Sequence, residues 1–115
     1  MYQFSYAEVL DESGSEARDN ERRALDRAVE LLAKATESGP RSRDAVEAIF
    51  YVRRLWDLLI DDLASPENDL PANLRAGLIS IGIWIIKQTE LIRLGKSEDF
   101  KGIREICATI RDGLK

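Results

Sequence analysis

Few residues in this chain are of a type that carries out catalysis. The 115 residues include no histidine and one cysteine, Cys107. Histidine is the side chain most often used as a general base or metal ligand, and a catalytic cysteine needs such a base beside it. Cys107 falls at helical spacing among apolar residues, which is typical of a small core residue. The sequence therefore argues against acid-base and nucleophilic catalysis.

Metal and nucleotide sites also lack their usual patterns. Asp57 and Asp61 are one helical turn apart, but the histidines that accompany carboxylates in helical di-iron sites are missing. The seven glycines are scattered, and the Gly-Lys-Ser/Thr motif of a phosphate-binding loop does not occur. Ser65 to Asp69 lacks the glycine and the final glutamate of a calcium loop. We therefore expect a protein that is not an enzyme and uses no cofactor or metal.

Composition and charge narrow the class of partner. The chain is 44% hydrophobic and 33% charged, as in ordinary globular proteins, and its length suits one domain over 1–115. The formal net charge of -4 argues against nucleic acid and anionic lipid as main partners. Its apolar runs are shorter than the roughly 20 residues of a membrane span. The first residues do not form a signal peptide, so we expect a cytoplasmic protein.

The most apolar stretch lies in the second half of the chain. Between Leu78 and Ile86 the only residues that are not aliphatic are Ser80, Gly82 and Trp84. A segment that is apolar on every side should be the central element of the fold or the floor of a binding site. Proline before it and glycine after it predict a helix over 70–94. Glycine inside a helix costs about 1 kcal/mol, so we expect another backbone to approach Gly82 closely.

Apolar residues three and four positions apart predict three more helices, at 13–38, 42–64 and 98–113. The connections are short, which favours antiparallel packing of successive helices. The predicted fold class is all-α, a small antiparallel bundle of four main helices with an N-terminal arm over 1–12. The last helix is the shortest and should leave a groove beside the second and third helices.

The N-terminal arm carries three aromatic residues, Tyr2, Phe4 and Tyr6. They alternate as in a strand, but Tyr2 and Tyr6 also fit helical spacing with Val9, so the conformation is left open. The arm could fold back to cap the core or serve as a docking segment.

The predicted groove supplies the other candidate partner-binding residues. Trp56 and Trp84 could be its aromatic anchors, and Arg53 or Arg54 could stand at its rim. Both tryptophans are equally compatible with a plain core role. Together with Tyr2, Phe4 and Tyr6, these residues form the candidate site, and its expected occupant is an amphipathic helix.

Four stretches together resemble a known family. They are YQFSYAEVL at the start, ERRALDRAVELL in the first helix, VEAIFYVRRLWDLLIDDLASPENDLP across the second helix and its turn, and LRAGLISIGIWIIKQTELIRLGKSEDFKGI after it. The combination of LASPEN with LISIGIW is more specific than a generic helical pattern. Over nearly its whole length the chain resembles the flagellar biosynthesis regulator FlaF family.

This resemblance implies a cytoplasmic, non-enzymatic protein required for flagellum formation. It implies post-transcriptional action on flagellin synthesis or secretion, often in opposition to a second regulator, FlbT, and an association with flagellin before export. We expect flagellin to be bound in a chaperone-like, helix-in-groove manner. The alternative is an RNA-binding or regulator-binding protein that controls translation of flagellin mRNA, with FlbT as a partner in the second case.

Overall fold

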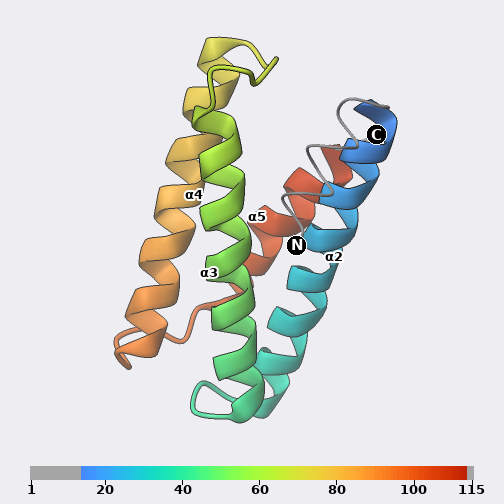
Figure 1. Cartoon of the computed structure of the whole chain (residues 1–115). Coiled ribbons are helices and arrows are strands. Elements are labelled where there is room, and N and C mark those ends of the chain that lie inside the picture. Colours follow the sequence, from blue (N-terminus) through green and yellow to red (C-terminus); the bar gives the residue numbers. More distant parts are fainter. Residues whose placement is uncertain (1–13, 114–115) are drawn as a thin grey trace.

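The computed structural model describes residues 14–113, which form four α-helices and no strand. The helices are α2 (Gly14–Ser38), α3 (Arg43–Ala64), α4 (Ala72–Arg93) and α5 (Phe100–Gly113). They pack into an elongated all-α bundle with principal extents of 41 × 23 × 23 Å (Figure 1). The all-α fold class is confirmed, and Tyr2, Phe4 and Tyr6 of the predicted arm lie outside the described residues.

Glycine residues and polar side chains mark the ends and the starts of the helices. Gly39 and Gly95 have positive φ angles of 102° and 75° after α2 and α4, a conformation that glycine adopts without a steric penalty. The hydroxyl oxygen of Ser42 accepts a hydrogen bond from the N–H of Ala45 (3.1 Å) and caps α3. At the start of α5, the carboxylate of Asp99 accepts a hydrogen bond from the N–H of Gly102 (2.9 Å), and the hydroxyl oxygen of Ser97 accepts from the N–H of Asp99 (3.1 Å).

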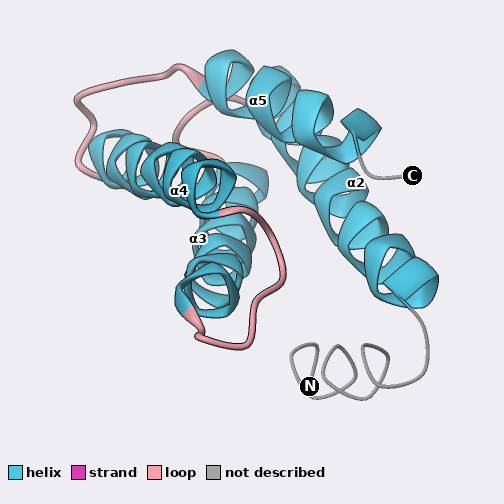
Figure 2. Cartoon of the chain, turned by 90° about the horizontal axis from the view of Figure 1, so that it is seen from above, coloured by secondary structure: helices cyan, strands magenta, loops and turns pink. Residues whose placement is uncertain are grey.

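The order of the helices in space is α4, α3, α2 and α5. The α3–α4 hairpin forms one layer and the α2–α5 pair forms the other, with α2 packed along α3 (Figures 1 and 2). The expectation that every pair of successive helices would be neighbours is therefore wrong for the last pair. The connection after α4 carries the chain across to α2, where the apolar stripe of α5 is buried. Its buried residues are Phe100, Ile103 and Cys107.

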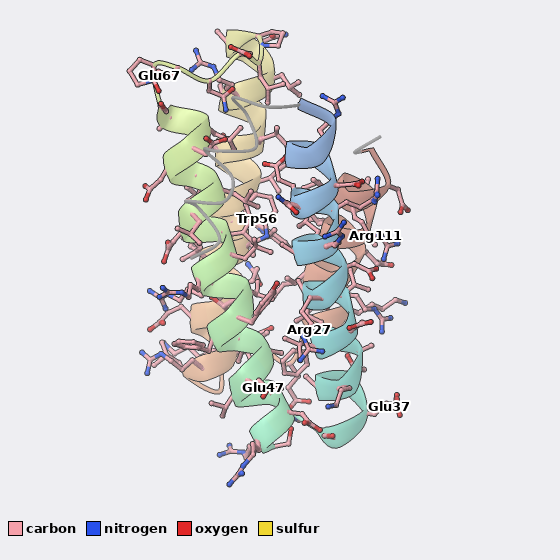
Figure 3. The ribbon with its side chains drawn as sticks, turned by 45° about the vertical axis from the view of Figure 1, so that its right-hand side comes forward. Arg27, Glu37, Glu47, Trp56, Glu67 and Arg111 are labelled. Atoms are coloured by element: carbon pink, nitrogen blue, oxygen red, sulfur yellow. The ribbon has the colours of Figure 1, made fainter. Side chains whose placement is uncertain are left out.

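The core lies between the two layers, and α3 is its central helix. Trp56 of α3 is only 1% exposed and is among the largest buried side chains; Figure 3 shows it between the helices. Tyr51, one turn earlier, donates a hydrogen bond from its hydroxyl to the backbone oxygen of Ala24 in α2 (3.1 Å). These contacts hold α3 against α2 and place the centre of packing one helix away from the predicted one.

Helix α4, predicted to be central, lies at the edge of the bundle. It packs along α3 alone as a full-length neighbour (Figure 2). Its buried positions are three and four residues apart, Gly82, Ile85, Thr89 and Ile92, so one side of the helix faces the core. The remaining sides still carry large apolar residues. Of the two predicted roles for this stretch, the central element of the fold is wrong, because apolarity on every side of α4 does not bury every side. The exposed apolar residues leave the second role, the floor of a binding site, as the prediction to be tested.

An exposed apolar face on helix α4

Six positions of α4 form a surface that we call the Trp84 face. They form two adjacent columns along the helix, and within each column the residues are seven positions apart. One column contains Leu74, Ile81 and Gln88, and the other contains Gly77, Trp84 and Leu91. Residues seven apart lie almost above one another on a helix. The side chain of Trp84 is 38% exposed, and Leu74 and Leu91 are also exposed. The Trp84 face is therefore a mainly apolar stripe about five turns long without a charged residue, in which Gln88 is polar and Ile81 is half-buried against the core.

Gly77 leaves the backbone of this face open. A Cβ atom built at Gly77 would have no heavy atom within 4 Å. A second helix could therefore approach α4 more closely at this point than at a position with a side chain. The combination of an exposed tryptophan, flanking leucines and a bare glycine is suited to packing a partner helix.

The turn before α4 is held in place by side chains. The guanidinium of Arg75 donates from Nη1 to the backbone oxygens of Ser65 (3.3 Å) and Leu63 (3.5 Å) at the end of α3. Asn68 donates to the backbone oxygen of Asp62 (3.2 Å) and accepts from the N–H of Leu70 (3.0 Å). These bonds give the LASPEN turn a structural role, because they fix where α4 begins relative to α3.

The structure separates the two predicted tryptophan anchors. Trp56 is buried on α3, so it offers no surface to a partner in this conformation, whereas Trp84 is exposed on α4. The indole N–H of Trp56 has no oxygen or nitrogen acceptor among the described residues. Burial raises the pKa of the Cys107 thiol on α5, and the Trp56 side chain partly offsets the rise. Trp56 thus joins α3 to α5 in the core.

The predicted arginines also lie away from Trp84. Arg53 Nη1 donates to Glu90 Oε1 (2.9 Å) across the α3–α4 pair, and Arg54 is exposed on α3. Glu90 and Trp84 are six residues apart, which places them about 120° apart around α4. Arg53 therefore belongs to a different face of the hairpin, and the predicted groove with tryptophan anchors and an arginine rim is not assembled as one site.

Glu90 is held between two arginines. Arg93 donates to its carboxylate from Nε (3.0 Å) and Nη2 (2.5 Å), and Arg53 donates on the other side. These hydrogen bonds, first from Arg93 and then from Arg53, lower the pKa of Glu90 to about 2. Both arginines thus form part of one charged cluster that ties α3 to α4.

Sequence reasoning missed two other exposed apolar residues, Val46 and Phe50. Both belong to the apolar set of α3, and their exposed fractions are 66% and 67%. The sequence did contain a signal for such exposed residues. The apolar residues of α3 cover more than half of the helix circumference, which is more surface than two neighbouring helices can bury.

Two possible sites are not supported by the described residues. No group of three or more His, Cys, Asp and Glu side chains in residues 18–113 is arranged to hold a metal ion. Within the described part of the chain, no helix combines the length and the apolarity needed to cross a bilayer. The exposed apolar faces therefore stand out as the candidate functional features.

Comparison with known families agrees with the resemblance seen in the sequence. A family model described as "Flagellar protein FlaF" matches residues 2–114, nearly the whole chain. The chain belongs to the FlaF family. Neither the curated proteins nor the solved structures contain a match. Membership makes this a flagellar protein, and both the LASPEN turn and the Trp84 face lie within the matched region.

Proposed function

We propose that this FlaF-family protein binds flagellin through the Trp84 face and regulates flagellin synthesis or secretion after transcription. The observation that carries the proposal is the exposure of Trp84 in the middle of an uncharged apolar stripe. Exposed patches of this kind mark interaction sites on soluble proteins, and tryptophan is enriched among residues that dominate binding energy.

A helical segment of flagellin is the occupant that fits the surface best. Flagellin subunits polymerise through terminal helical segments with apolar faces, and binding would mask such a segment until export. The stripe on α4 runs straight for about five turns, so a partner helix can lie along it with anchors three, four and seven residues apart. This mechanism is chaperone-like and needs no catalytic group.

The experiment is a calorimetric titration of soluble flagellin into the full-length protein and two variants. Trp84→Ser should weaken binding at least about 30-fold, because truncation of a central aromatic anchor commonly costs 2 kcal/mol or more. Ile83→Ser is the matched control, since Ile83 is 52% exposed on the same helix but points about 100° away from Trp84. Loss of binding in both variants, or in neither, contradicts the proposal.

Salt dependence separates this mechanism from the RNA-binding alternative. Contact with phosphates weakens steeply as salt rises, whereas apolar helix docking changes little. Several of the described arginines form ion pairs with carboxylates, which does not favour an RNA surface; they are Arg22, Arg23, Arg27, Arg53, Arg93 and Arg111. The same titration with FlbT in place of flagellin tests the regulator-binding alternative.

A further inference from the structure

A second exposed apolar surface lies on the outer side of the α3–α4 hairpin, away from the Trp84 face. We call it the Phe50 face and define it by Val46, Phe50 and Arg53 of α3, Glu90 and Arg93 of α4, and Leu94, the residue that follows α4. Val46 and Phe50 are on successive turns of α3 and are about two-thirds exposed, and Leu94 at the end of α4 is also exposed. Three large apolar side chains thus face solvent beside a cluster of ion pairs.

Two contacts fix the register that brings these residues together. Arg53 is paired with Glu90 at 2.9 Å, and the side chain of Ile60 lies against Gly82, where an added Cβ would be 2.9 Å from Ile60 Cγ1. The two helices are antiparallel (Figure 1), so moving forward along α3 from Arg53 to Ile60 corresponds to moving backward along α4 from Glu90 to Gly82. The two contacts therefore agree on one register. Extending it by about one turn beyond the Arg53–Glu90 pair places Leu94 within about one helical turn of Val46.

The charges at this face are predominantly positive. Arg53 and Arg93 share the single carboxylate of Glu90, which leaves the cluster with an excess positive charge. Segments 43–57 and 87–96, which carry the face, contain six Lys and Arg residues and four Asp and Glu residues. The whole chain, in contrast, has a formal net charge of -4. The Phe50 face is thus a basic-rimmed apolar surface on an acidic protein.

We propose that the Phe50 face docks an acidic amphipathic helix of a partner protein, one whose apolar stripe is bordered by Asp or Glu side chains. Phe50 and Val46 supply the apolar contact. Arg53 and Arg93 present further N–H donors to the partner's carboxylates, because each guanidinium has five. The Phe50 face shares no residue with the Trp84 face, so this site can hold or fail independently of the proposed flagellin site.

The charge distribution selects this occupant over two others. In a symmetric pair of copies the same arginines would contribute to both sides of the contact, and like charges placed together at an interface are unfavourable. An anionic membrane would meet the basic rim, but it would also meet the net negative charge of the whole chain and the carboxylate of Glu90 inside the face. A protein helix can place its carboxylates selectively beside Arg53 and Arg93.

The test uses the full-length protein and two synthetic helical peptides with the same leucine stripe. One peptide has Glu on both sides of the stripe and the other has Lys. The Glu peptide should bind, and affinity should fall at least about 10-fold in Phe50→Ser and several-fold in Arg93→Gln. Raising NaCl from about 50 mM to about 500 mM should weaken binding as well, because exposed charge pairs are screened. Trp84→Ser is the control and should bind the Glu peptide as the wild type does.

Four results would overturn the proposal. They are equal binding of the Glu and Lys peptides, unchanged affinity in Phe50→Ser, binding only to vesicles of phosphatidylserine and phosphatidylcholine, and sedimentation of the protein as a dimer that Phe50→Ser converts to a monomer. Phe50 is mostly solvent-exposed, so Phe50→Ser should fold normally, and its circular dichroism and unfolding midpoint confirm that a loss of binding is local.

Discussion

Trp56 lies against the bare Cα of Gly82, so that a Cβ atom added at Gly82 would be only 2.8 Å from Cε3 of the indole ring. This contact sets the spacing between α3 and α4. The expected close approach at Gly82 is therefore real, but the approaching groups are the side chains of Trp56 and Ile60 and not a backbone. Glycine in the middle of α4 is explained by the space that these side chains occupy.

Alanine substitutions at two glycines of α4 should change stability in opposite directions. Gly82→Ala gains about 1 kcal/mol of helix propensity, but the new methyl group crowds Trp56 and Ile60, and overpacking costs about 1–3 kcal/mol. Gly77→Ala makes the same propensity gain with nothing within 4 Å. Urea denaturation should show a lower free energy of unfolding for Gly82→Ala and a higher one for Gly77→Ala. A higher free energy of unfolding in both variants would mean that Trp56 and Ile60 do not lie as close to Gly82 as described.

The two tryptophans should differ in their accessibility to a quencher. Trp84 is 38% exposed and Trp56 is 1% exposed. In Trp56→Phe, where Trp84 is the remaining fluorophore, acrylamide should quench emission efficiently and the spectrum should be red-shifted. In Trp84→Phe, the remaining Trp56 should be protected until urea unfolds the protein. If Trp84 in folded Trp56→Phe were quenched as weakly as Trp56 in folded Trp84→Phe, Trp84 would lie in the core.

Glu90 should titrate far below an ordinary glutamate. Hydrogen bonds from Arg93 and Arg53 lower its pKa from 4.5 to about 2. A lowered pKa in the folded state means that this group contributes stability above pH 4.5 and that the contribution disappears as the pH falls through about 2. Carboxyl NMR should follow this titration. Arg93→Gln should raise the pKa more than Arg53→Gln, and the reverse order would contradict the assigned geometry.

Cys107 should react with thiol reagents only when the bundle opens. Its side chain is fully buried, and burial raises the pKa of the thiol, so both access and the thiolate fraction are reduced. Alkylation by iodoacetamide should be slow in the native protein, fast in urea, and faster in the destabilised Gly82→Ala variant than in the wild type. Rapid alkylation of the native protein, at the rate seen in urea, would show that the buried side of α5, which carries Cys107, is not packed against the rest of the bundle.

Local signals in the sequence predicted the helices well. Each helix begins and ends within two residues of its predicted position, because proline, glycine and serine act on their immediate neighbours. Ser42 and Gly95 behave as expected for this reason.

Packing between distant residues was predicted less well. The pairing of α5 with α2 depends on contacts such as Arg111 Nη1 with Asp26 Oδ1 (2.8 Å), two residues far apart in the chain. No periodicity within one helix reveals such a pairing. Likewise, helical spacing does not tell which apolar side of α4 meets a neighbour, so Trp84 could not be distinguished from a core residue by sequence alone.

The central claim is that the Trp84 face of α4 receives a helix of flagellin, and methyl NMR tests it most directly. The full-length protein, labelled at the methyl groups of Ile and Leu, is titrated with unlabelled soluble flagellin. The largest chemical-shift changes should occur at Leu74, Ile81 and Leu91, while Leu25 and Leu32 in the core of α2 should change little. Unchanged spectra at saturating flagellin, or shifts confined to residues outside α4, would contradict the account.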